Sequence, residues 1–233
     1  MLITITFAML IGKKLGFSEN FRFLMASGNA VCGSSAIAAT APVVGADDNE
    51  KGIAITTVNV TGTVLMILLP LISKIIFSTE VIKTSAFIGG ILQSVGQVVA
   101  SGSMVNEQVK DLSTIFKIVR IIFLVFVVLS FGTMKKDYSQ SNCKKSNTKV
   151  KVPWYVLGFF IMCFLFTIGI LSPQISKTFK LISNNFEIIA LAGIGMRVNF
   201  RELIDQGIKI SIYALGVAAV QIVSAITLIT ILL

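Results

Sequence analysis

Long apolar stretches, separated by short polar segments, run through the chain of 233 residues. A bilayer crossing needs about 20 mostly apolar residues in a helix, and most of these stretches approach or exceed that length. The first one, residues 1–11, is shorter and ends at the polar residues 12–14. The other predicted spans cover residues 23–44, 53–76, 81–100, 115–131, 152–171, 179–196 and 208–233. The pattern predicts an all-α, polytopic transmembrane helical bundle, with residues 1–233 forming a single integral membrane domain.

Two of these spans are interrupted by small and polar residues. Residues 27–35 have the sequence SGNAVCGSS, which places two glycines, an asparagine and three serines inside an apolar stretch. The span at 81–100 is interrupted by Gly89, Gly90 and Gly96. In hydrocarbon, unpaired backbone groups are tolerated only where protein or a water-filled cavity surrounds them. We therefore expect discontinuous helices beside a polar site, as in the binding sites of transporters.

The first interruption has two interpretations. Small residues let membrane helices approach closely, and Gly28, Gly33 and the neighbouring alanines fit that packing role. Asn29 and the paired serines exceed what packing needs, which favours a polar site. A half-helix that begins near Gly33, Ser34 and Ser35 would point its N–H groups and the positive end of its dipole inward. The ligand preferred by such a site is an anion.

Polar side chains also repeat at helical spacing on several predicted spans, so that each set lies on one face of its helix. The sets are Thr56, Asn59 and Thr63; Gln93, Gln97 and Ser101; Lys180, Asn184 and Glu187; and Gln221 with Ser224. Each residue alone could join two helices by a hydrogen bond, a contact of about 0.6 kcal/mol in membranes. Taken together, the four sets favour a shared polar interior, either a pathway or a binding cavity.

Three ionisable residues of these spans need an explanation: Glu187, Lys117 and Arg120. A charge at the bilayer centre costs at least about 2.5–3.5 kcal/mol, so it needs a partner or water. Lys117 and Arg120 are candidate partners for Glu187, or a cationic pair that attracts anions. Glu187 is alternatively a site for a coupling proton. The plainer alternative is that all three lie near the membrane interface and extend their charged ends to water.

The distribution of charged residues predicts how the spans are oriented in the membrane. Of all residues, 55% are hydrophobic and 13% are charged, whereas soluble domains carry about 25% charged residues. The net charge of +9 comes mainly from residues between spans, which indicates orientation in a membrane rather than a nucleic-acid partner. The segment 134–151 has six lysines and one aspartate and is predicted to be cytoplasmic. Alternation from there places the acidic residues 47–50 outside, provided that residues 23–44 cross completely. It places these basic residues inside: Lys13, Lys14, Arg22, Lys74, Lys83, Arg197, Arg201 and Lys209.

We expect no catalytic site, no metal and no cofactor. The chain has no histidine, so it has no Ser/His/Asp triad and is a poor candidate for zinc or haem. Its three cysteines, Cys32, Cys143 and Cys163, have no CxxC spacing. The P-loop pattern GxxxxGK[ST] does not occur, which excludes ATP hydrolysis by that route. A membrane protein without enzymatic activity is the expectation.

Five segments resemble one bacterial family in the same order. They are residues 28–42 (GNAVCGSSAIAATAP), 89–102 (GGILQSVGQVVASG), 117–120 (KIVR), 152–159 (VPWYVLGF) and 191–196 (LAGIGM). Together they resemble the YeiH-like family of bacterial inner-membrane proteins, which are described as sulfate exporters. The resemblance covers essentially all 233 residues. It implies a helical transporter fold with inverted repeats and export of a small sulfur oxyanion.

Two departures from the family pattern accompany this resemblance. Family members usually have a histidine where this chain has Gln93, which puts proton coupling through that position in question. The family pattern also implies helices before residue 1 of this chain. We therefore expect an N-terminally truncated form in which one repeat is incomplete.

The sequence thus predicts a secondary transporter in the bacterial inner membrane that moves a small inorganic anion, sulfate or sulfite, by alternating access. The predicted binding residues are Asn29, Gly33, Ser34, Ser35, Gln93, Gln97, Lys117 and Arg120, with Glu187 in a coupling or ion-pair role. The alternatives are a non-transporting membrane protein such as a sensor subunit, an inactive truncated fragment, or a channel. The expected partners are the anion and the lipid bilayer, without nucleic acid, and a homo-oligomer is left open.

Overall fold

The computed structural model describes residues 1–123 except 79, residues 207–233, and single positions between these ranges. The chain divides into two compact units, residues 1–150 with 199–233, and residues 151–198. The helices described below belong to the first unit. The basic segment 134–151 and Glu187 lie outside the described residues, as do most of the spans predicted at 152–171 and 179–196.

Eight helices and no strands make up the described part of the chain, which confirms the predicted all-α class. They are α1 (Leu2–Lys14), α2 (Glu19–Ala30), α3 (Ser34–Val44), α4 (Asp48–Phe77), α5 (Val81–Ile91), α6 (Val95–Ser103), α7 (Glu107–Ile122) and α12 (Ile208–Leu232). Helices α4 and α12 are long and apolar enough to cross a membrane, and α3 and α5 are shorter apolar helices. Both predicted interruptions are present, between α2 and α3 and between α5 and α6.

Helix α7 begins earlier than the apolar pattern predicts. Its first residue is Glu107 rather than residue 115, because the Asn106 side chain accepts a 2.8 Å hydrogen bond from an N–H group of the first turn. Such a cap satisfies a donor that has no partner within the helix. Charged residues in the first two turns hide this start from a hydrophobicity criterion. As a result, Lys117 and Arg120 lie towards the end of α7 rather than at its entry.

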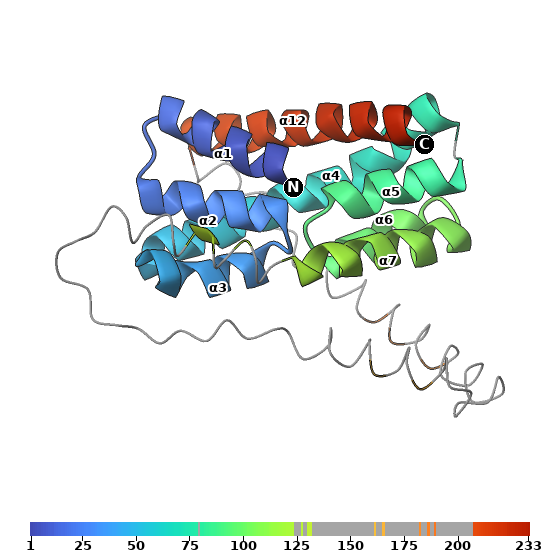
Figure 1. The fold of residues 1–233 in the computed structure, drawn as a ribbon, viewed down its shortest axis with the longest axis horizontal. Coiled ribbons are helices and arrows are strands. Elements are labelled where there is room, and N and C mark those ends of the chain that lie inside the picture. Colours follow the sequence, from blue (N-terminus) through green and yellow to red (C-terminus); the bar gives the residue numbers. More distant parts are fainter. Residues whose placement is uncertain are drawn as a thin grey trace. The chain divides into compact units, whose positions relative to one another are not determined.

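Helices α2 and α3 form a re-entrant hairpin, in which the chain turns back on itself. The Asn20 side chain, in the first turn of α2, donates a 3.2 Å hydrogen bond to the main-chain oxygen of Gly45, just after α3. The open ends of the two helices therefore lie together. Figure 1 shows the pair, in blue, side by side. The prediction that residues 23–44 cross completely is wrong, because the break reverses the chain direction as well as interrupting the helix.

Helices α5 and α6 form a second hairpin, and α7 packs against both of them. The Ser85 hydroxyl of α5 donates a 3.4 Å hydrogen bond to the carbonyl of Val109 near the start of α7. Gly102, near the end of α6, is so close to α7 that an added Cβ would lie 2.6 Å from the Lys110 Cα. The open end of this hairpin thus lies at the start of α7. Figure 1 shows the two hairpins entering the first unit from opposite ends.

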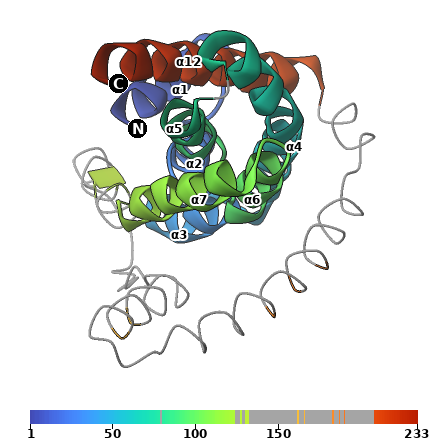
Figure 2. The same ribbon diagram turned by 90° about the vertical axis from the view of Figure 1, so that its right-hand side faces the viewer.

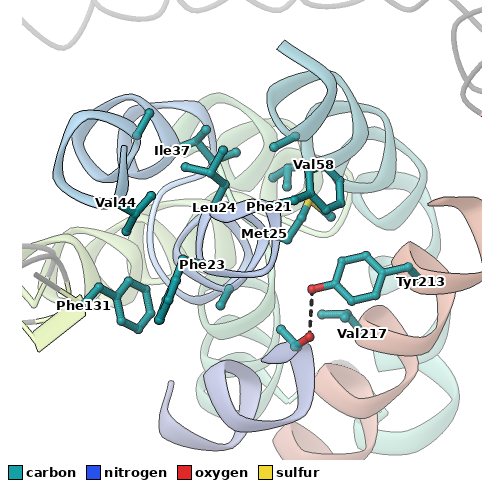
Figure 3. Packing of buried hydrophobic residues seen from close by; sticks show 14 residues of the cluster. Phe21, Phe23, Leu24, Met25, Ile37, Val44, Val58, Phe131, Tyr213 and Val217 are labelled. Carbon is teal, nitrogen blue, oxygen red and sulfur yellow. Dashed lines mark hydrogen bonds between the residues drawn. The ribbon is translucent and has the colours of Figure 1, made fainter. Parts of the chain in front are cut away.

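Helices α1, α4 and α12 surround the hairpins. Helix α4 packs on α2, α3, α5, α6 and α12, and α1 packs on α2 and α12; Figure 2 shows α4 and α12 beside the hairpins. One apolar cluster, which includes Phe21 and Tyr213, joins α1, α2, α3, α4 and α12. In Figure 3 the Tyr213 hydroxyl donates a 2.9 Å hydrogen bond to the main-chain oxygen of Ala8. A second cluster, which includes Phe77 and Phe87, joins α4 to α5 and α12.

The two hairpins change which segments lie at each end of the first unit, compared with the prediction. Because α2 and α3 return to their starting end, the acidic residues 47–50 lie at the same end of the first unit as Lys14. The prediction had placed them on opposite sides. Lys74 and Lys83, after α4 has traversed the unit, lie at the other end, where the prediction had grouped them with Lys14. The start of α12 remains beside the end of α1, as predicted, because Tyr213 packs next to Gly12.

Candidate functional site

The tips of the two hairpins meet inside the first unit. An added Cβ on Gly33, in the first tip, would lie 3.4 Å from the Cβ of Gln93, in the second tip. Helices α2 and α5 end at the tips, and α3 and α6 begin there. Four helix ends therefore converge on one place, which we call the tip region and define as residues 29–35 and 90–97.

Gly33 is required by the shape of the first tip. Its backbone has φ 67° and ψ −126°, a conformation that residues with a side chain rarely adopt. Gly33 precedes α3 and offers no side chain to cap it, whereas α6 has a complete capping box. In that box, the Ser94 hydroxyl accepts a 3.1 Å hydrogen bond from the Gln97 main chain, and the Gln97 side chain accepts one of 3.3 Å from the Ser94 main chain.

Lys117 joins the ends of α2 and α5. A helix leaves its last carbonyl groups without partners, and a break inside a membrane protein must satisfy them elsewhere. The Lys117 ammonium donates to the main-chain oxygens of Val31 and Leu92, the latter at 2.8 Å. The lysine is fully buried. One side chain of α7 therefore binds both tips at once.

Arg120, one turn further along α7, does the same with its guanidinium group. Its Nε donates to the main-chain oxygen of Ala30 at 2.7 Å, and its Nη1 donates to that of Gly90 at 2.6 Å. Its Nη2 donates to the main-chain oxygen of Asn29. The planar fork of arginine suits such multiple contacts. Both predicted cations thus point into the tip region and not to water.

Among the described residues, the charges at the tip region sum to a positive value. Each helix end has about half an elementary charge, so the C-terminal ends of α2 and α5 offset about one of the two charges of Lys117 and Arg120. The N-terminal ends of α3 and α6 add about one positive charge. Among the described residues, the ion pairs are Lys51–Asp48, Lys83–Glu80 and Lys110–Glu107, and none involves the two tip cations. The arrangement therefore favours a negatively charged ligand.

A network of side-chain amides centres on Asn29, which is 3% exposed. Its Nδ2 donates to the Met25 carbonyl at 2.9 Å, and its Oδ1 accepts a 3.3 Å hydrogen bond from Gln93 Nε2. Its main-chain oxygen accepts a further hydrogen bond of 2.8 Å from Gln221 Nε2 of α12. Gln221 was absent from the predicted binding set, although its polar spacing with Ser224 was a signal. The network ties α12 to both hairpin tips.

Helix α4 supplies the space that the second tip needs. An added Cβ on Gly62 would lie 2.5 Å from Gln97 Oε1 and 2.7 Å from Gln93 Oε1. Gln97 Nε2 donates a 3.2 Å hydrogen bond to the main-chain oxygen of Asn59, one turn away on α4. Gly62 was absent from the predicted binding set, and its only signal was a lone glycine within an otherwise apolar and β-branched span. Its lack of a side chain lets the ends of two glutamines meet α4.

The structure thus brings most of the predicted binding residues together. Those that lie in or against the tip region are Asn29, Gly33, Gln93, Gln97, Lys117 and Arg120. Ser34 and Ser35 form the first turn of α3, where Ser34 is half-buried and Ser35 is exposed. A pairing of Lys117 or Arg120 with Glu187 stays a prediction, because Glu187 lies outside the described residues.

Comparison with known proteins adds the family. The model of a protein family described as "Conserved hypothetical protein 698" matches residues 1–214. A "UPF0324 membrane protein" of Clostridium perfringens is 51% identical over 99% of this chain and 69% of its own length. One from Lactiplantibacillus plantarum is 49% identical over the whole chain and 71% of its own length. One from Agrobacterium fabrum is 28% identical over 91% of the chain and 60% of its own length. No solved structure matches.

Proposed function

The chain belongs to the conserved hypothetical protein 698 family of multi-pass membrane proteins, which is the predicted YeiH-like family, and from this premise we propose that it is a secondary transporter. Its substrate in this proposal is a small inorganic anion, sulfate or sulfite. The anion binds in the tip region and crosses the membrane by alternating access. The names of the relatives state a membrane location and no substrate, so the site supports an anion, and the choice of sulfate or sulfite rests on the resemblance given above.

The observation that supports this proposal is the meeting of two helix N-termini beside two buried cations. N-terminal helix ends bind anions through their N–H groups and their dipole, and transporters place such ends at their substrate sites. In this proposal the anion contacts the first turn of α3 through Gly33, Ser34 and Ser35. Asn29, Gln93 and Gln97 complete the site.

Lys117 and Arg120 have a different part in the proposed site from the one that the sequence suggested. Their donors are directed at main-chain oxygens of both tips. They therefore attract the anion through space and hold the two tips together, without contacting the anion themselves. A buried positive charge acts over several ångströms because protein and lipid screen it weakly.

The hairpin geometry suits alternating access. The two hairpins enter the first unit from opposite ends and touch at Gly33 and Gln93. Withdrawal of one tip would open the site towards one end, and withdrawal of the other would open it towards the opposite end. In this proposal the substrate passes between the tips without a continuous pore, which favours a carrier over a channel.

Anion flux into proteoliposomes tests the proposal. The purified chain should take up labelled sulfate or sulfite, Ser34→Ala should slow uptake, and Gly33→Leu should abolish it. Gly52→Ala is the matched control, because an added Cβ on this exposed helical glycine would meet nothing within 4 Å. Unchanged uptake in Gly33→Leu would show that the site is elsewhere. A well-folded wild-type chain that moves no anion would favour the alternative of a non-transporting membrane protein.

A further inference from the structure

Two buried oxygens at the tip region have no hydrogen-bond partner among the described residues: Oε1 of Gln93 and Oε1 of Gln221. The two residues are 1% and 3% exposed. Their amide groups cannot simply be turned over, because each Nε2 already donates to Asn29. Turning either amide would set an oxygen against an oxygen of Asn29. The network therefore has two unpaired acceptor oxygens, and each one needs a hydrogen-bond donor.

Gln93 belongs to the contact between the two tips at which we propose that the anion binds. Gln93 is the residue of the second tip that faces Gly33, the residue that precedes α3. Its Oε1 is directed towards Gly62 of α4, next to the side-chain amide of Gln97 in the first turn of α6. Gln93 thus lies against the residue that precedes α3, and its unpaired acceptor lies beside the first turn of α6. A ligand that reached both would meet N–H donors of α3 and an acceptor on Gln93.

The charge of the tip region decides which kind of donor fits. A metal ion would satisfy carboxamide oxygens, but Lys117 and Arg120 and two helix N-termini make the region positive and repel it. Sulfate is a dianion that has only acceptor oxygens, so one of them would face Gln93 Oε1 without a proton between. An oxyanion that retains one acidic hydrogen has both the negative charge and the required donor.

We propose that the tip region selects a singly protonated oxyanion, such as hydrogen sulfite, over a fully ionised dianion, such as sulfate. This inference rests on the proposed function and names its substrate class. The O–H group of the anion donates to Gln93 Oε1, and its other oxygens accept from the first turn of α3. Gln221 orients Asn29, which in turn holds the Gln93 amide in place.

Protein groups that titrate are few around this site. Among the described residues, the titratable groups at or near the tips are Cys32, Lys117, Arg120 and the Met1 amino group, which interacts electrostatically with Arg120. The facing parts of α4 and α12 supply the neutral Asn59 and Gln221. Titration of a protein group would change the binding of every anion with pH. Protonation of the ligand would change only the binding of anions whose last ionisation lies near neutral pH. Sulfate, which stays a dianion throughout, separates the two causes.

The test is a comparison of sulfite and sulfate binding to the full chain in detergent, measured by isothermal calorimetry from mildly acidic to mildly alkaline pH. Wild-type protein should bind sulfite about tenfold more weakly after the sulfite has lost its proton, whereas sulfate should bind weakly at every pH. Gln93→Met, which removes the acceptor but keeps the side-chain length, should abolish the pH dependence for sulfite. Thr84→Val is the matched control, because the Thr84 hydroxyl is also buried, has no partner among the described residues and lies outside the tip region.

Several outcomes are decisive. Equal binding of sulfate and sulfite at all pH values would overturn the inference while leaving anion transport intact, because a buried water would then be the donor to Gln93. The same pH dependence in Gln93→Met and wild type would also overturn it. If Gln93→Met does not fold, Gln93→Asn withdraws the oxygen by one methylene and should give the same loss. Binding of neither anion would instead contradict the proposed function.

Discussion

Gly33 and Gln93 lie against each other across two hairpin tips that are 60 positions apart in the sequence. The Cβ that Gly33 lacks would lie 3.4 Å from the Gln93 Cβ. Around this contact, the cations of α7 satisfy the carbonyl ends of α2 and α5, and the N-terminal ends of α3 and α6 face the same place. The contact therefore marks the point where packing, electrostatics and the proposed substrate site coincide.

Gly33→Ala should destabilise the protein by about 1–3 kcal/mol, the cost of holding a residue with a side chain in a conformation that only glycine adopts readily. Thermal unfolding of the purified chain in detergent measures this change. Gly52→Ala should have the opposite sign, a gain of up to about 1 kcal/mol, because alanine favours a helix where space is open. Equal stability of the two variants would contradict the tip conformation.

Arg120→Lys should unfold at a markedly lower temperature than wild type. A lysine ammonium cannot reproduce the fork that reaches carbonyls of both tips, and each buried carbonyl left without a donor costs about 1–3 kcal/mol. Lys83→Met is the control, since its 2.9 Å pair with Glu80 is partly exposed, and such pairs contribute about 0–1 kcal/mol. A similar small effect of both substitutions would show that the carbonyl contacts of Arg120 do not hold the tips.

Gly62→Ala and Gly89→Ala should separate function from stability. At Gly62 the added methyl would displace the side-chain ends of Gln93 and Gln97, so anion uptake should fall, with a smaller loss of stability than a clash with main chain causes. At Gly89 it would lie 2.4 Å from the main-chain oxygen of Ser113, so α5 and α7 must move apart and stability should fall. Uptake assays and thermal unfolding on both variants check this contrast. Loss of stability in Gly62→Ala with normal uptake would contradict the role given to its neighbours.

Labelling of single cysteines should show which segments lie on the same side of the membrane. Asn49→Cys and Lys13→Cys should react with a membrane-impermeant maleimide from the same side of oriented vesicles, and Lys74→Cys should react from the other side. The parent chain, with its own three cysteines, gives the background. Reaction of positions 13 and 49 from opposite sides would show that α2 and α3 cross the membrane in sequence and do not return.

The sequence allowed the two interruptions to be predicted, because glycine, asparagine and serine are rare at membrane depth without a structural reason. It did not reveal the return of the chain at each break, since composition indicates where a helix stops but not the direction in which the next one leaves. Hydrophobicity also misplaced the start of α7, where Asn106 caps a charged first turn.

The grouping of Asn29, Gln93 and Gln97 with Lys117 and Arg120 was predicted as an anion site. The specific contacts of the two cations were not predictable, because main-chain oxygens have no sequence signal. Gly62 and Gln221 were missed for a related reason. Gly62 matters because it has no side chain, which leaves room for its neighbours. Gln221 contacts the site through Asn29, 192 positions earlier in the chain.

The most direct test of an anion held between two hairpin tips is an experimental structure of the protein with selenite, the selenium analogue of sulfite, located by its anomalous scattering. Our proposal predicts one selenium peak at the first turn of α3, within hydrogen-bond distance of the main chain at Ser34 and Ser35 and of the Gln93 side chain. A peak elsewhere with the tips unoccupied, or helices α2 and α3 running straight through the membrane, would contradict it.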